Sequence, residues 1–373
     1  MRSALFVLAA EVLLSCSTFG AQRFLWFEHV NGTATLLPDG RVLLAGWQSP
    51  RGPKSAEWYD PKNNAFARAA DMPTPRTFDP VSTLLKDGRV LLVGGFSPKN
   101  ERLETIDAYD PKQDTWKVIG KIPEQTIVSD AVALTDSTVL ITTWVGGKDG
   151  ILIFSPEDGS VKSVGHPKMA CNGTALATPL RTGKVLITHL AYGDGDPNAF
   201  LYDPAQAKTS TLPRMAKNRD GHQAILLPDG RVLVTGGDEG APTAEIYDPD
   251  KNAFTPASPM VAPRTMHRAV ALSDGRVLIV GGITPIDEEA LKEVEKQKKG
   301  SGLPMSKPLA AEVEVYDPKT DKFSALKKPP SNPQFWQGSR TGVYHQLAGG
   351  EILFMSFRGP IYFDPKTESW RLP

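Results

Sequence analysis

The sequence has few of the residues and motifs that mark the commonest kinds of reactive site. It contains 2 cysteines in 373 residues, which excludes a disulfide framework as the basis of its stability. Lys plus Arg and Asp plus Glu both number 42, so no net charge attracts the chain to nucleic acid or to an anionic membrane. We find no glycine-rich phosphate loop, nucleophile elbow or cysteine-rich metal cluster. We therefore expect no cofactor, no metal and no nucleic-acid partner.

Residues 1–21 contain the one long apolar run, and it is too short to span a bilayer. A basic residue followed by such a run is typical of an export signal. Leu13-Leu14-Ser15-Cys16 resembles the bacterial lipobox, which implies cleavage before Cys16 and a lipid on its sulfur. The alternative is a plain secretory signal cleaved near Gly20 or Ala21. In both cases we expect an exported protein of the bacterial cell envelope or a secreted one, in contact with a membrane only through a lipid on Cys16.

The rest of the chain repeats one phrase. LPDGRVLLAGW at 37–47 returns as LPDGRVLVTGG at 227–237. Spacings in the forties, except before the last copy, are typical of propeller blades and other repeat arrays. The first position of the Asp-Gly-Arg-Val-Leu phrase falls at Asp39, Asp87, Asp136, Thr182, Asp229, Asp274 and Gly349.

A second phrase follows each copy of the first. It is an aromatic residue followed by Asp-Pro or Ser-Pro, as in Tyr247-Asp248-Pro249. In most copies a second apolar or aromatic residue follows the first aromatic at a constant spacing, as Phe254 follows Tyr247. In the fifth unit we predict strands at 223–227, 231–234, 244–249 and 252–257. Asp229-Gly230 is expected to supply the positive φ angles of a two-residue hairpin. One unit is thus a sheet of four antiparallel strands.

These units resemble the kelch family, whose repeats carry a diglycine after strand two and aromatic residues in strands three and four. The diglycines are Gly94-Gly95, Gly236-Gly237 and Gly281-Gly282, whereas the first, fourth and seventh units lack the pair. The wording is closest to the bacterial, galactose-oxidase-like branch. The resemblance implies an all-β protein, a seven-bladed β-propeller of four-stranded antiparallel blades, formed as one domain by residues 22–373.

Two features of this propeller stay open. The ring closes either by side-chain packing between the first and last blades or by an added edge strand at 23–27. An insertion at 284–310 lies in the sixth blade, and its segment DEEALKEVEKQKK is predicted to form a short helix. It is either a solvated excursion or a flap over the rim.

Functional groups are expected on the rim that carries the variable links between strands two and three and between blades. The residues entering strand one mix donors, acceptors and titratable groups, as a polar ligand requires. The repeated arginines among them could instead form hydrogen bonds that hold the blades together. Two histidines alone make a weak metal site. The candidates are Arg76, Asp79, Asp130, Asn172, Arg219, Asp220, His222, Arg264, His267, Arg340 and Tyr344.

Three functions are considered. The resemblance to galactose oxidase implies a copper-radical enzyme, but Tyr344-His345 is misplaced for that site and Cys171 has no nearby tyrosine. A sugar epimerase or mutarotase would use a carboxylate or histidine such as Asp79, Asp220 or His222 as general acid or base. We favour a monomeric binding protein that recognises a glycan or protein partner through the loop-bearing rim.

Overall fold

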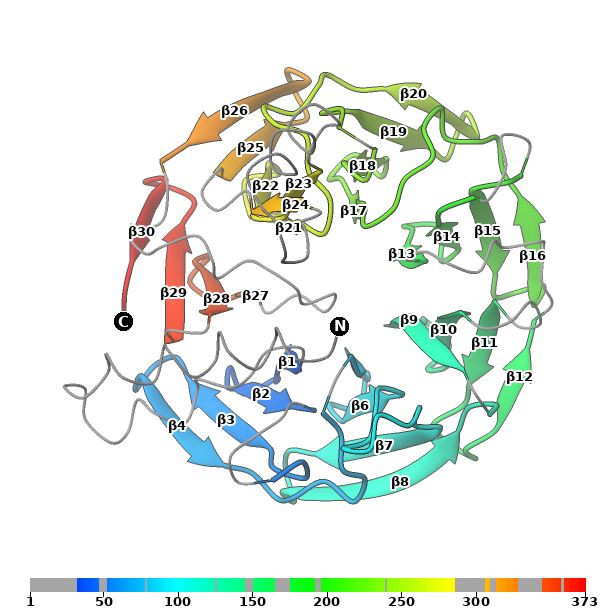
Figure 1. The fold of residues 1–373 in the computed structure, drawn as a ribbon, viewed down its shortest axis with the longest axis vertical. Helices are drawn as coiled ribbons and strands as arrows, with labels where there is room; N and C mark the ends of the chain where they lie inside the picture. Colours follow the sequence, from blue (N-terminus) through cyan, green and yellow to red (C-terminus); the bar gives the residue numbers. More distant parts are fainter. Residues whose placement is uncertain are drawn as a thin grey trace, which may run out of the picture.

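The computed structural model describes residues 32–46, 52–77, 79–124, 126–144, 150–164, 175–191, 196–238, 240–285, 306–308, 313–327, 344–356 and 359–373. These residues form seven sheets of four antiparallel strands each, arranged as blades around a central axis. Figure 1 shows strand one of a blade near the axis and strand four at the outer edge, for example β1 and β4. The predicted seven-bladed β-propeller is confirmed.

The bounds of the strands follow the predicted repeat. Blade 1 consists of β1 (Thr33–Leu36), β2 (Val42–Ala45), β3 (Glu57–Asp60) and β4 (Ala65–Arg68). Blade 2 consists of β5 (Val81–Leu84), β6 (Val90–Val93), β7 (Thr105–Asp110) and β8 (Thr115–Lys121). Blade 3 consists of β9 (Ile127–Ala133), β10 (Val139–Trp144), β11 (Ile151–Phe154) and β12 (Val161–Ser163).

The remaining blades have the same order along the chain. Blade 4 consists of β13 (Leu176–Pro179), β14 (Val185–Thr188), β15 (Ala199–Asp203) and β16 (Lys208–Thr211). Blade 5 consists of β17 (Gln223–Leu226), β18 (Val232–Thr235), β19 (Ala244–Asp248) and β20 (Ala253–Pro256). Blade 6 consists of β21 (Arg268–Ala271), β22 (Val277–Val280), β25 (Val313–Asp317) and β26 (Lys322–Leu326). Blade 7 consists of β27 (Tyr344–Gln346), β28 (Ile352–Ser356), β29 (Gly359–Asp364) and β30 (Ser369–Arg371).

The turn between strands one and two differs from the predicted two-residue hairpin. In blade 5 the Leu227 amide donates to the Arg231 carbonyl at 2.8 Å, which leaves a loop of Pro228, Asp229 and Gly230. Of these, only Gly230 has a positive φ, +91°. The same loop forms without a proline in blade 6, where the Leu272 amide donates to the Arg276 carbonyl at 2.8 Å. Asp229 Oδ1 accepts the Arg231 amide at 3.0 Å, and such an aspartate turn followed by a left-handed glycine favours the three-residue loop.

The fixed aromatic spacing reflects direct pairing across strands three and four. Tyr247 of β19 lies opposite Phe254 of β20 in the register, and their ring centroids are 4.9 Å apart. Tilted aromatic pairs at this distance add to the stability that burial alone provides. The Tyr247 hydroxyl then donates to Asn252 Oδ1 at 3.0 Å, which holds the turn between the two strands.

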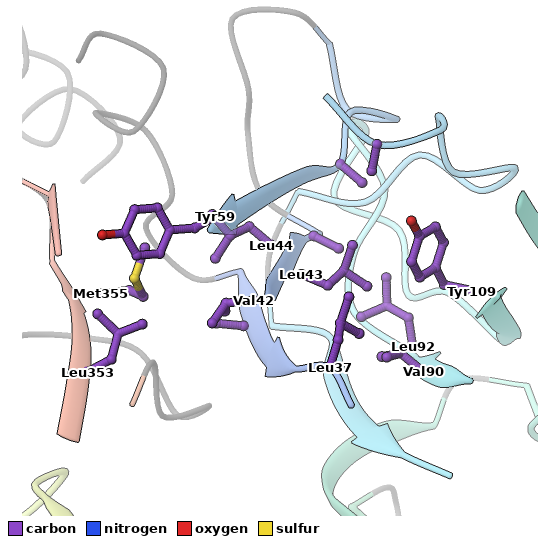
Figure 2. Close-up of a cluster of buried hydrophobic side chains, with 14 of the residues drawn as sticks. Leu37, Val42, Leu43, Leu44, Tyr59, Val90, Leu92, Tyr109, Leu353 and Met355 are labelled. Carbon is purple, nitrogen blue, oxygen red and sulfur yellow. The ribbon is translucent and has the colours of Figure 1, made fainter. Parts of the chain in front are cut away.

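The hydrophobic core lies between neighbouring blades, and the same packing closes the ring. Leu353, Met355 and Tyr362 of blade 7 belong to one buried cluster with the core of blade 1, and Figure 2 shows Leu353 and Met355 beside Tyr59. The hydroxyls of Tyr59 and Tyr362 are 2.5 Å apart. Blade 7 obtains all four of its strands from residues 344–371. Side-chain packing therefore joins blades 1 and 7, while residues 23–27 lie outside the described residues.

The insertion of blade 6 begins and ends as a two-stranded ribbon, β23 (Ile283–Pro285) with β24 (Ser306–Pro308). The predicted helix at 287–299 lies outside the described residues. Within the described ranges we find no helical segment of membrane-spanning length and hydrophobicity.

Candidate functional site

The central channel is the hollow on which all seven blades converge. Its cavity has a volume of about 560 Å³, within the range of small-molecule sites. The described residues that line it come from the innermost strand of every blade: Ala34, Thr35, Leu36, Val81, Ser82, Thr83, Leu84, Ser129, Asp130, Leu176, Ala177, Thr178, Gln223, Ala224, Arg268, Tyr344 and His345.

The two ends of the channel differ in polarity. Gln223, Arg268 and Tyr344 are the first residues of β17, β21 and β27, so they lie at the end that faces the links between blades. Leu36 and Leu84 are the last residues of β1 and β5 and lie toward the Asp-Gly turns. The charged and amide groups of the channel therefore gather at the loop-bearing rim.

Asp130 enters the channel from β9. The register of β9 and β10 shifts beside it, so that Ser129 has no partner residue, and such a bulge changes the direction of the neighbouring side chains. The two carboxylate oxygens of Asp130 accept hydrogen bonds, one from the Ala131 amide at 2.8 Å and one from the Ala177 amide of blade 4 at 3.0 Å. Burial raises the pKa of Asp130 to about 6, although both bonds oppose the rise.

Arg268 and Tyr344 contribute a cation and a phenol to the same end. Arg268 Nη1 donates to the His267 carbonyl at 3.2 Å, and burial lowers the pKa of the guanidinium to about 10. The Tyr344 hydroxyl donates to the Ala269 carbonyl at 2.8 Å, a bond between blades 7 and 6. Burial raises the pKa of Tyr344; Arg268 opposes this rise and Asp130 adds to it, so both charges act on the one phenol.

The three predicted arginines that the structure describes lie inside the scaffold. Arg76, Arg219 and Arg264 are fully buried, and each pairs with a strand-three carboxylate of its own blade. The pairs are Arg76 with Asp107 at 3.1 Å, Arg219 with Glu245 at 2.8 Å and Arg264 with Glu314 at 2.5 Å. Each also donates to a carbonyl of the glycine that follows strand two: Gly94, Gly236 and Gly281. None lines the channel cavity, and their contact with a ligand stays a prediction.

The predicted histidine pair joins neighbouring blades. His222 Nε2 lies 2.8 Å from the Thr188 hydroxyl of blade 4, and His267 Nε2 lies 2.8 Å from the Thr235 hydroxyl of blade 5. Both side chains are fully buried. One nitrogen of each ring is thus engaged with a threonine at the end of a strand two, whereas the buried Nδ1 atoms have no hydrogen-bond partner among the described residues.

The remaining candidates divide between the rim and the undescribed residues. Asp79 and Asp220 precede strand one of blades 2 and 5, and Asp79 has a left-handed φ of +45°. Asp220 shares the rim with blade 6, because its carbonyl accepts a bond from the Thr265 hydroxyl at 2.5 Å. Asn172, Arg340, Cys16 and Cys171 lie outside the described residues.

Sequence reasoning missed Arg268 and Gln223. Both directly follow a predicted histidine, His267 and His222. Adjacent strand residues point to opposite faces, so the alternation could have identified them once the histidines were known to face a neighbouring blade.

Buried neutral histidines should make the protein less stable in acid. Burial, with the charge of Arg219, lowers the pKa of His222 to about 3, and burial lowers that of His345 to about 4 and that of His267 well below its ordinary value. The unfolded chain then binds more protons below about pH 6.5. The contribution of these histidines to the free energy of unfolding should be fully present above that pH. It should fall toward pH 4 by about 1.4 kcal/mol per pH unit for each histidine.

Asp130 should offset part of this loss. Because its pKa is raised, the folded state binds the extra proton between about pH 6 and pH 4. Urea unfolding between pH 7 and pH 4.5 measures how steeply the free energy of unfolding changes with pH. His222→Gln should reduce this slope by the contribution of one histidine. A slope that does not change in this variant would contradict the neutral state of His222.

Comparison with known proteins agrees with this architecture. Residues 80–122 match the family model described as Kelch motif, a segment that covers blade 2. No curated protein matches the chain. Among solved structures it is similar to a fungal alcohol oxidase of the AA5 family in complex with copper, with 14% sequence identity, a TM-score of 0.64, and coverage of 93% of this chain and 73% of that one. The predicted seven-bladed propeller is confirmed, its second blade matches the Kelch motif, and at this identity the likeness to the solved structure concerns the fold alone.

The described residues do not reproduce a copper site. No three His, Cys, Asp or Glu side chains among them lie close enough together to hold a metal ion. His222 and His267 use their Nε2 atoms between blades, and the Tyr344 hydroxyl is bonded to a main-chain carbonyl. Two imidazole nitrogens and the phenol of Tyr344 are thus bonded to the scaffold in the described part of the chain.

Proposed function

We propose that this chain, a seven-bladed β-propeller that carries a Kelch motif, is an exported binding protein that recognises a glycan at the polar end of its central channel. The observation that carries the proposal is the gathering of Asp130, Gln223, Arg268 and Tyr344 in one cavity at the loop-bearing rim. These side chains come from four different blades. A rigid ring therefore fixes their relative positions, which is what selective binding of a polar ligand requires.

The size and lining of the cavity favour a glycan over a protein partner. A volume of about 560 Å³ accepts a sugar but not a folded chain. Thr35, Ser82, Thr83 and Thr178 line the walls together with aliphatic residues, and the hydroxyls of Thr35 and Ser82 bond each other at 2.8 Å. Such a mixture can bond sugar hydroxyls and pack against the faces of the ring.

The bonding of the titratable groups favours binding over catalysis. Both oxygens of Asp130 accept main-chain bonds, and His222 bonds Thr188. A general acid or base must reach the proton that it transfers, whereas a binding group needs only to stay in place. These contacts hold the side chains in place and support the binding role.

A glycan array with the labelled full chain tests the proposal. Gln223→Ala should reduce the signal of the recognised glycans by about tenfold, because it removes a channel amide whose one bond to the described protein, to the His222 carbonyl, is 3.0 Å long. Gln206→Ala is the matched control, because Gln206 is exposed in the turn between β15 and β16 on the opposite rim. Equal signals from both variants, or no recognised glycan, would overturn the proposal.

Export through a lipidated Cys16 is a separate part of the proposal, and it is supported by the lipobox-like residues alone. We expect the full chain, expressed in a bacterium, to fractionate with membranes and to partition into detergent. Cys16→Ala should move it to the soluble fraction. Recovery of that variant in the membrane fraction at the parental level would contradict a lipid anchor on Cys16.

A further inference from the structure

We propose that the ligand of the channel is a sugar acid whose carboxylate pairs with Arg268. The inference rests on the proposed function, because it names the chemical class of the ligand bound at the same site. It is carried by the contrast between Arg268, which is half-buried, and Arg76, Arg219 and Arg264, which are fully buried.

Arg268 has no carboxylate partner among the described residues. Arg76, Arg219 and Arg264 each have one within 3.1 Å. Arg268 has a single hydrogen bond to a described residue, from Nη1 to the carbonyl of its neighbour His267 at 3.2 Å. Arg268 nevertheless lines the channel cavity, unlike these three arginines.

The energetics favour an anionic ligand. A charge removed from water is costly unless it is paired, and burial already lowers the pKa of Arg268. A guanidinium presents its N–H groups in one plane and can hold a carboxylate by two parallel bonds. A ligand carboxylate would therefore supply the pairing that the described protein does not.

Asp130 determines what the rest of the ligand must be. It belongs to blade 3, whereas Arg268 belongs to blade 6, on the other side of the ring (Figure 1). The two side chains form no ion pair with each other. A carboxylate at this position repels a second anion and accepts bonds from hydroxyl groups. The ligand should therefore carry an anionic group beside Arg268 and hydroxyl groups beside Asp130, and a sugar acid combines the two.

Titration calorimetry of the full chain with D-galacturonate and D-glucuronate tests the inference, with galactose and glucose as neutral counterparts. At least one acid should bind about tenfold or more tightly than its neutral counterpart. Arg268→Gln should remove this preference. Arg231→Gln is the matched control, because Arg231 pairs with Asp229 on the opposite rim and its loss should leave binding unchanged.

Thermal melting distinguishes a loss of the site from a loss of the fold. Without ligand, Arg268→Gln should melt close to the parental temperature, because Arg268 is half-buried and has no carboxylate partner among the described residues. An Arg268→Gln variant that is folded and retains the preference for acids would overturn the inference, as would failure of both acids to bind. Equal binding of acids and neutral sugars would overturn the inference while leaving the proposed glycan function intact.

Discussion

Replacing Glu245 with alanine should lower the free energy of unfolding by about 3–5 kcal/mol, because it leaves a buried guanidinium without its counter-ion. Glu245 Oε1 accepts bonds from Nη2 and Nε of Arg219 at 2.8 and 3.1 Å. The same carboxylate accepts the Ala216 amide at 2.7 Å and the Lys217 amide at 3.3 Å. It therefore attaches the connection between blades 4 and 5 to strand three of blade 5. Urea unfolding at neutral pH measures the loss.

Asp71→Ala provides the matched control. Asp71 pairs with Arg68 at 2.9 Å, but both side chains are exposed. Exposed pairs contribute about 0–1 kcal/mol, so this variant should unfold close to the parental midpoint. A Glu245→Ala variant as stable as Asp71→Ala would mean that the buried pair of Arg219 and Glu245 does not stabilise the propeller.

Gly236→Ala should lower the free energy of unfolding by about 2–5 kcal/mol, the sum of a backbone and a packing term. Gly236 has a left-handed φ of +63°. A Cβ atom there would press against the Arg264 carbonyl oxygen and lie 2.7 Å from Cε1 of His267, both in the neighbouring blade. The diglycine is thus the place where blade 5 meets the entry of blade 6, and a methyl group would separate them.

Gly40→Ala separates the two terms. Gly40 has a φ of +89°, and a Cβ atom there would meet no other atom within 4 Å. Only the backbone term applies, and we expect a loss of about 1–2 kcal/mol. Thermal or urea unfolding of both variants tests the comparison. Equal losses in the free energy of unfolding would show that the packing of blade 5 against blade 6 does not require a glycine at position 236.

The repeat predicted the architecture because each copy carries the whole pattern of one blade. The Tyr247 and Phe254 spacing, for example, appears in the sequence and becomes a cross-strand pair in the fold. The two-residue hairpin was wrong because the Asp229 carboxylate accepts the Arg231 amide and only Gly230 takes a positive φ, which together give a three-residue loop. Local chemistry thus decided the turn type within a correctly predicted unit.

The sequence was less informative about the site, for physical reasons. The repeated arginines were visible, but their acidic partners lie at different separations along the chain, as with Arg219 and Glu245 compared with Arg264 and Glu314. The direction of Asp130 depends on a bulge at Ser129 that no turn residue announces. Arg268 differs from Arg76, Arg219 and Arg264 in lining the channel and in lacking a carboxylate partner among the described residues, and both properties depend on the packed ring.

A crystal structure of the full chain with the best glycan of the array tests the central claim most directly. The account predicts ligand density at the polar end of the channel, in contact with inner strands of at least blades 3, 5 and 6 through Asp130, Gln223 and Arg268. Density confined to the outer strands or to the rim of the Asp-Gly turns would contradict it.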